Sequence, residues 1–233
     1  MIIGNTVAVI IPALGEELSL PSLLRAIPNY VDKVVVVDNG STDRTAEVAT
    51  AAGATVVYEP RRGYRQACSS GISALPEFDL LVFLDADFCD NPKMIFNMCE
   101  PIAKGSAEFV LGSRMHGVSQ KCLTPPQRFG NWLAARLMNL IWQTHYTDLG
   151  PFRAIRRTSL DQLNMLDTNF GWTVEMQIKA AQAGLKITEI EVPYRHRDYG
   201  QSKVSGTVSG VWHAGTKILY VIFREFWAQR FSS

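Results

Sequence analysis

Leu80-Leu81-Val82-Phe83-Leu84 is a continuous apolar run that leads directly into Asp85-Ala86-Asp87. The run has the length and composition of a strand that is buried on both faces of a parallel sheet. The two carboxylates then lie one residue apart at the carboxyl end of that strand. Mg²⁺ prefers carboxylate oxygens and commonly joins one or two of them to substrate phosphates. Alone, such a pair is also expected of a solvated turn, so the rest of the chain decides its meaning.

Similar apolar runs occur on both sides of this strand. They are Val7–Ile11, Val34–Val37, Thr55–Tyr58 and Ala107–Leu111. Helix-forming segments separate the runs, at Glu17–Ile27, Thr45–Ala52, Arg65–Leu75 and Lys93–Ala103. This alternation predicts right-handed βαβ units and an α/β fold with a mostly parallel, twisted sheet flanked by helices. Ligands of such sheets bind at the carboxyl ends of the strands. The loops 12–17, 38–43 and 85–90 are therefore expected to converge on one site.

The second half of the chain has a different pattern. Residues 127–144 predict a helix with one apolar stripe, which comprises Phe129, Trp132, Leu133, Leu137, Leu140 and Ile141. A further helix is expected over Gly171–Ala183, and Lys186–Val192 is expected to be an edge strand that ends at Pro193. From Val208 onward, apolar residues recur at helical spacing, which predicts a C-terminal amphipathic helix.

Composition excludes several classes of protein. The chain has 233 residues, 47% of them hydrophobic, which suits a single globular domain. Its net charge of +1 gives no overall field that would attract nucleic acid. The four cysteines have no metal-binding spacing, and we expect them to be reduced thiols in a cytoplasmic protein. We see no signal peptide and no apolar run of the roughly 20 residues that span a bilayer.

Six short motifs, in this order and spacing, resemble glycosyltransferase family 2. They are Ile10–Glu17, Val37–Asp43, Asp85–Asp87, Leu111–Arg114, Asp148–Ala154 and Tyr199–Lys203. Within the family, the chain resembles the polyprenyl-phosphate glycosyltransferase branch, which includes dolichyl-phosphate mannose synthase. The resemblance implies the GT-A fold as a single domain over residues 1–233. Its nucleotide-sugar-binding half would span 1–112 and its acceptor-side half 113–206, and 207–233 would form the amphipathic helix.

The resemblance also implies a donor site with a metal ion. The nucleotide sugar, UDP- or GDP-linked, would contact Pro12, Leu14, Glu16, Asp38, Gly40, Arg62, Asp85 and Ala86. Asp87 would hold Mg²⁺ or Mn²⁺ together with Asp85. A carboxylate can bind an N–H of either base, so the sequence leaves the donor open between UDP-glucose and GDP-mannose types.

On the acceptor side, the resemblance implies that Arg114 and Arg128 bind a polyprenyl phosphate, because the forked guanidinium suits phosphate oxygens. Together with Asp87 they are the predicted catalytic residues. Arg197 and Lys203 would lie on a loop that closes over both substrates and would add positive charge as the diphosphate leaves.

Three positions depart from the family pattern. Gly15 stands where an Asn is usual, which removes one polar contact near the nucleotide. Cys89 stands where a Gln often supplies an extra metal ligand, and thiols favour softer metals than Mg²⁺. The glycine-rich stretch after the third strand is replaced by Arg61–Ala67. Its three arginines fit contact with the donor diphosphate or, alternatively, a solvated helix start.

The implied reaction is an inverting transfer of a hexose to the acceptor phosphate. A phosphate is already ionised, so this reaction needs no general base. An alcohol acceptor would need a carboxylate, for which Glu175 and Asp148 are the candidates. Glu175 equally fits a buried partner for an arginine. A catalytically silent nucleotide-sugar-binding subunit is the remaining alternative.

Association with other molecules is left open by the sequence. The terminal stripe comprises Val211, Trp212, Gly215, Ile218, Leu219, Ile222, Phe223 and Phe226. It suits peripheral contact with the cytoplasmic face of a membrane, the core of the protein, or a homo-oligomer.

Overall fold

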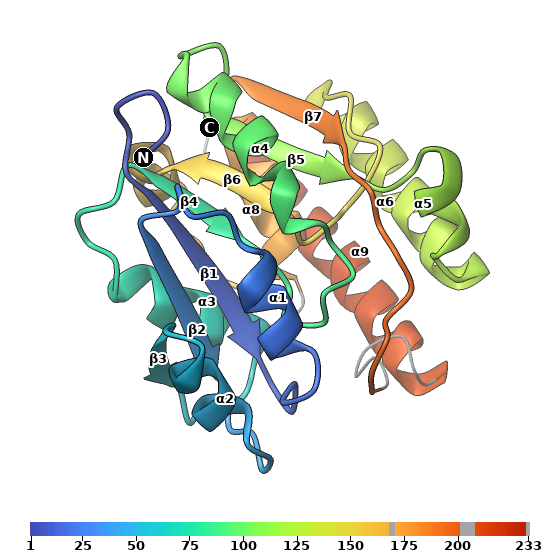
Figure 1. Cartoon of the computed structure of the whole chain (residues 1–233). Coiled ribbons are helices and arrows are strands. Elements are labelled where there is room, and N and C mark those ends of the chain that lie inside the picture. Colours follow the sequence, from blue (N-terminus) through green and yellow to red (C-terminus); the bar gives the residue numbers. More distant parts are fainter. Residues whose placement is uncertain (168–170, 201–207, 232–233) are drawn as a thin grey trace.

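The computed structural model describes residues 1–167, 171–200 and 208–231. Its centre is a twisted sheet of seven strands in the order β3-β2-β1-β4-β6-β5-β7 (Figure 1). The strands are β1 Val7–Ala13, β2 Lys33–Asp38, β3 Thr55–Tyr58, β4 Leu80–Phe83, β5 Phe109–Ser113, β6 Arg153–Arg156 and β7 Ile187–Glu191.

Strand direction places the carboxyl ends of β1, β2 and β4 at one edge of the sheet. β1 pairs in parallel with β2 and with β4, so Ile10 faces Val35 on one side and Phe83 on the other. β6 runs antiparallel to both β4 and β5, and β7 pairs in parallel with β5. The loops that follow β1, β2 and β4 are thereby brought to the same place, as the sequence predicts.

Helices cover both faces of the sheet (Figure 1). One face carries α1 Leu20–Ala26, α2 Thr45–Ala51, the short helix η1 Pro92–Met94 and α4 Ile95–Ala103. The other carries α3 Tyr64–Ser73, α6 Pro125–Trp142, α7 Arg157–Gln162, α8 Trp172–Gln182 and α9 Val208–Phe231. The small helix α5 Gly117–Lys121 precedes α6.

Each face has its own hydrophobic core, because side chains alternate along the strands. In β1, Ala8 and Ile10 belong to the core under α3, whereas Val9 and Ile11 belong to the core under α1. Gly71 lets α3 approach β1 closely, since a Cβ atom there would lie 2.5 Å from Cγ2 of Ile10.

The predicted α/β fold is confirmed, and so is an edge strand that ends before Pro193. Two features differ from the sequence prediction. β6 was not predicted, and the apolar residues of α6 do not form the single stripe that was expected. Leu137 and Ile141 pack against the core, whereas Phe129, Trp132 and Leu140 are exposed.

The C-terminal helix α9 packs against α6 and α8. From its predicted stripe, Ile218 and Ile222 face the core and Phe223 is exposed, while Val211 and Trp212 lie outside the described side chains. Arg224 anchors the helix, because its Nη2 donates to Oε1 of buried Glu175 over 2.8 Å. No helix in the described ranges has the length and apolar character needed to cross a membrane.

Candidate active site

Side-chain hydrogen bonds join the loop after β1 to the loop after β2. The Gly15 amide donates to Oγ of Ser41 over 2.9 Å, and the Glu16 amide donates to Oγ1 of Thr45 over 2.8 Å. Gly15 has φ +65°, so a glycine suits this turn better than the asparagine usual in the family. Pro12 and Leu14 are half-buried and Glu16 is buried. The structure therefore brings these predicted donor residues together.

Asn39 links the loop after β2 to the segment before α3. Its Nδ2 donates to the backbone oxygens of Glu59 and Arg61 over 2.9 and 2.8 Å, and its Oδ1 accepts the Gly63 amide over 2.8 Å. Neighbouring Asp38 is buried, and its Oδ1 caps the turn by accepting the Ser41 amide. No sequence pattern indicates this role of Asn39, because its partners lie about 20 residues away.

The three arginines before and in α3 have different partners. Arg61 pairs with Glu59 over 2.9 Å, and Arg65 donates to the backbone oxygen of Met165 over 3.1 Å. Arg62 is exposed, and its Nε lies 3.9 Å from where a Cβ of Gly40 would stand. Only Arg62 of the three therefore lies beside a predicted nucleotide-binding position in the described structure.

The acidic motif follows β4 with its two carboxylates in different surroundings. Asp85 is half-buried and accepts a hydrogen bond from the Tyr64 hydroxyl over 3.1 Å. Burial, and then the charge of Asp87, raise the pKa of Asp85 to about 7. Ala86 between them is buried in the core. Tyr64 is thus a site residue that the sequence did not identify.

The backbone turn after the motif places the Asp87 carboxylate within hydrogen-bond distance of an amide in its own loop. Phe88 has φ 58°, a left-handed conformation that is uncommon for a non-glycine residue and often marks functional loops. The turn lets the Cys89 amide donate to Oδ1 of Asp87 over 3.0 Å. Burial raises the pKa of the Cys89 thiol, which keeps it protonated. Because Mg²⁺ prefers oxygen ligands, the Cys89 thiol is a poor ligand for that ion.

Asp85 and Asp87 fit a divalent cation that is shared with a ligand. Among the described residues, no group of three or more His, Cys, Asp and Glu side chains forms a protein cage for a metal. Mg²⁺ and Mn²⁺ do not require one, since one or two carboxylates with substrate phosphates and water suffice. Burial and the neighbouring charge of Asp87 both disfavour the ionised form of Asp85 and raise its pKa, and a bound cation would favour the ionised form.

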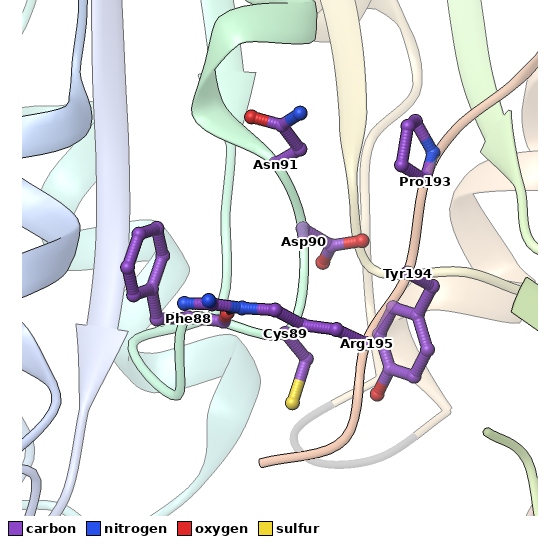
Figure 2. A pocket seen from close by; sticks show the side chains of 7 residues that line it. All are labelled: Phe88, Cys89, Asp90, Asn91, Pro193, Tyr194 and Arg195. Carbon is purple, nitrogen blue, oxygen red and sulfur yellow. Dashed lines mark hydrogen bonds between the residues drawn. The ribbon is translucent and has the colours of Figure 1, made fainter. Parts of the chain in front are cut away.

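A strap of residues 192–198 crosses over the acidic loop (Figure 2). The Arg195 amide donates to the backbone oxygen of Cys89 over 3.0 Å, and the Arg195 guanidinium lies 3.8 Å from the centre of the Phe88 ring. Further along, Nη2 of Arg197 lies 3.0 Å from Oε1 of Glu16 and 3.2 Å from Oδ2 of Asp87. Arg197, itself a predicted site residue, thereby joins two others, Glu16 and Asp87. Lys203 lies outside the described residues.

Two cavities adjoin the strap. One of about 240 Å³ is lined by residues 88–91 and 193–195 (Figure 2). A smaller one of about 90 Å³ lies between residues 15–19 and Tyr199-Gly200. The Tyr199–Lys203 motif thus begins beside the loop that follows β1.

Asp90 is an anomaly beside this site. It is 2% exposed, and neither carboxylate oxygen has a hydrogen-bond partner among the described residues. Burial raises its pKa well above the ordinary value, although the charge of Arg114 opposes the rise. An unpartnered buried carboxyl is costly, and such groups concentrate at functional sites.

We expect Asp90→Asn to raise the free energy of unfolding by about 1 kcal/mol at pH 8, because it removes an unpartnered buried charge. The gain should shrink towards pH 5. With a raised pKa, folded wild type binds a proton that the unfolded chain takes up only at lower pH, so acid stabilises wild type. Urea unfolding of both proteins at the two pH values checks this. A wild type more stable than the variant at pH 8 would show that Asp90 has a stabilising partner.

Arg114 is buried and held by Asp148. Its Nε and Nη2 donate to the two oxygens of Asp148 over 2.7 and 3.0 Å. Asp148 also accepts bonds from Asn131 and from the amides of Arg114 and Leu149. Burial opposes ionisation of Asp148, but Arg114 outweighs it and lowers the pKa. Arg128, the other predicted acceptor residue, is exposed in the first turns of α6.

Glu175 is the buried structural partner of an arginine. Its carboxylate accepts the amides of Leu166 and Asp167 over 2.8 and 2.7 Å, in addition to Nη2 of Arg224. Both carboxylates that were candidates for a general base are therefore saturated with donors.

Known proteins of similar sequence are glycosyltransferases. A family model described as glycosyl transferase family 2 matches residues 8–163. An uncharacterized glycosyltransferase of Mycobacterium tuberculosis is 35% identical over 89% of this chain and 93% of that protein. Dolichyl-phosphate hexose transferase of Haloferax volcanii is 31% identical, with 95% and 96% covered. Undecaprenyl-phosphate mannosyltransferase of Micrococcus luteus is 26% identical, with 88% and 89% covered.

Among solved structures, glucosyl-3-phosphoglycerate synthase from Mycobacterium tuberculosis has the same fold. In its complex with Mn²⁺, UDP-glucose and phosphoglyceric acid it superposes with a TM-score of 0.74 at 21% identity. The match covers 96% of this chain and 80% of that one. The predicted GT-A fold is thereby confirmed.

Proposed function

Because this chain belongs to glycosyl transferase family 2, we propose that it transfers a hexose from a nucleotide sugar to a polyprenyl phosphate, with inversion at the anomeric carbon. Its activity as a glycosyltransferase follows from the family. The acceptor is the proposed part. It is supported by the relatives whose names specify dolichyl and undecaprenyl phosphates, at 31% and 26% identity.

The hydrogen bonding of the candidate general bases supports a phosphate as the acceptor. An alcohol must lose a proton as it attacks, whereas a phosphate oxygen attacks as the anion it already is. Asp148 and Glu175, the candidate bases, each accept several hydrogen bonds and are buried. Burial raises the pKa of Asp90 well above its ordinary value. Both candidate bases are thus engaged by hydrogen-bond donors, whereas the predicted acceptor residues Arg114 and Arg128 are cations, which suit a phosphate.

The residues of the chain would act by positioning and by charge. Glu16, Asp38 and Arg62 would hold the nucleotide. Asp148 fixes the guanidinium of Arg114, which would orient the acceptor phosphate for attack on the side opposite the diphosphate. Asp85 and Asp87 would hold Mg²⁺ or Mn²⁺, which neutralises charge on the departing diphosphate when bound.

The proposal is tested by release of nucleoside diphosphate from a panel of UDP- and GDP-sugars with Mg²⁺ or Mn²⁺. Each donor is assayed with a short-chain polyprenyl phosphate, with the corresponding polyprenol, and with neither. We expect release that depends on the lipid phosphate for one donor. Release stimulated by the polyprenol but not by its phosphate would contradict the proposed acceptor.

We further propose that the outer faces of α6 and α9 contact the membrane that holds the acceptor. The two helices lie side by side, with Trp142 Nε1 donating to Gln229 Oε1 over 2.8 Å. Their exposed apolar side chains are Phe129, Trp132, Leu140, Tyr220, Phe223, Trp227 and Phe231. α6 contains no acidic residue, and Glu225, the acidic residue of α9, is buried against Arg224. Aromatic and basic residues without exposed acids suit an anionic lipid interface.

We expect Phe129→Ala with Trp132→Ala to weaken binding to vesicles of anionic phospholipid by about tenfold, since two aromatic side chains lose apolar burial. Co-sedimentation measures the binding. The matched control is Phe96→Ala, an exposed phenylalanine of α4 on the opposite face of the sheet, which should leave binding unchanged. Equal binding of wild type and the double variant would contradict this surface.

A further inference from the structure

Arg197 joins the two ends of the proposed donor site. A single nitrogen, Nη2, contacts Glu16 in the loop after β1 and Asp87 in the loop after β4. The side chains of Arg197, Glu16 and Asp87 are 18%, 9% and 16% exposed. Such shielded, charge-assisted contacts are stronger than ion pairs on an open surface.

The contact engages the oxygen of Asp87 that a metal ion would need. Oδ1 of Asp87 accepts the Cys89 amide, which belongs to the same rigid turn. Oδ2 accepts Nη2 of Arg197, which comes from a segment 110 residues further along the chain. Nη2 of Arg197 lies 3.2 Å from this oxygen, so the guanidinium would repel a cation that binds Oδ2. The exchangeable ligand of Asp87 is therefore Arg197.

We propose that Arg197 is the counter-ion of Asp87 and Glu16 when the donor site is empty, and that a divalent cation competes with it for Asp87. The inference rests on the proposed function, which assigns the cation to Asp87 and the nucleoside to Glu16. Metal–donor binding then displaces Arg197 from both carboxylates at once. The freed guanidinium lies at the site where the diphosphate carries its negative charge.

The strap can release Arg197 without losing its own attachment. Its earlier part is fixed by the amides of Tyr194, bonded to Oγ of Ser119, and of Arg195, bonded to the Cys89 oxygen. These anchors do not involve the Arg197 side chain, so they can persist when its contacts with Glu16 and Asp87 break. Gly200, with φ +70°, leaves room beside the guanidinium, since a Cβ there would lie 3.4 Å from Nη1 of Arg197.

The test measures Mn²⁺ binding to the ligand-free protein through the electron paramagnetic resonance signal of free Mn²⁺. We expect Arg197→Gln to bind Mn²⁺ about tenfold more tightly than wild type, because the competitor is removed. Arg197→Lys, which keeps the charge, should stay near wild type. Arg195→Gln is the matched control, with the same charge change in the same strap but stacked on Phe88, and its affinity should not change.

Asp87→Asn, assayed with UDP and GDP present, separates this inference from the proposed function. Loss of Mn²⁺ binding in Asp87→Asn, with no gain in Arg197→Gln, would overturn the competition and leave the proposed metal site intact. An equal gain in Arg195→Gln and Arg197→Gln would also overturn it, because the effect would be one of general charge. Mn²⁺ binding retained in Asp87→Asn would contradict both the inference and the proposed metal site.

Discussion

Asp87→Asn is expected to lower kcat by about 10³-fold, with the thermal midpoint within a few degrees of wild type. The asparagine keeps the size of the side chain and one oxygen, which can still accept the Cys89 amide. It removes the negative charge that would hold the cation against the departing diphosphate. The measurement is steady-state transfer at saturating metal and donor.

The matched control for this variant is Asp161→Asn. Asp161 is an exposed aspartate of α7 that forms a surface pair with Arg157, and its replacement should change neither activity nor stability noticeably. Activity of Asp87→Asn within tenfold of wild type, at unchanged stability, would show that this carboxylate is not central to the reaction.

Asp148→Ala is expected to lower the free energy of unfolding by about 3–5 kcal/mol, because it leaves a buried guanidinium without its partner. Arg114 is 8% exposed, and both Nε and Nη2 donate to Asp148. Three further donors, from Asn131, Leu149 and the Arg114 amide, also lose their acceptor. Urea unfolding at neutral pH measures the loss.

A double variant separates the ion pair from the rest of the effect. Arg114→Met with Asp148→Leu replaces the buried pair by apolar groups of similar size, which is often close to neutral. We expect it to regain the part of the stability that Asp148→Ala loses through the unpartnered guanidinium, while the three other donors still lack their acceptor and the protein remains inactive. A loss below about 1 kcal/mol for Asp148→Ala would mean that the site relaxes or admits water around Arg114.

Sequence patterns predict most of the sheet because its parallel strands are buried on both faces. Continuous apolar runs such as Val34–Val37 and Leu80–Leu84 leave few other structures open to them. β6 is different. Only two apolar residues lie between Arg153 and Arg156. The guanidinium of Arg153 is buried, and it donates to the backbone oxygens of Thr173 and Gly150. A buried arginine in a four-residue strand has no periodic signature.

The sequence pattern misplaces the start of a helix where the residues before it hold a loop together. Residues 17–19 precede α1 because Glu16 and Ser19 hold the loop, through Ser19 Oγ donating to Oε2 of Glu16 over 2.7 Å. In α6, apolar residues lie on two opposite faces, one in the core and one exposed. Sequence spacing does not say which apolar residues the fold covers.

The site was predictable as far as topology goes. The loops after β1, β2 and β4 meet because the carboxyl ends of parallel strands meet. Individual partners were not predictable, since they come from side-chain packing between distant segments. Arg197 reaches Asp87 across 110 residues, and Asp90 is distinguished from other aspartates by the partners it lacks within the described structure.

The structure of the isolated product would identify the acceptor group and the stereochemistry of the transfer. The protein is incubated with the active nucleotide sugar and a short-chain polyprenyl phosphate, and the lipid fraction is characterised by mass spectrometry and by the anomeric proton coupling in NMR. We expect a hexose joined to the polyprenol through its phosphate, with the anomeric configuration opposite to that of the donor. A hexose attached to a hydroxyl group, or one that keeps the configuration of the donor, would contradict it.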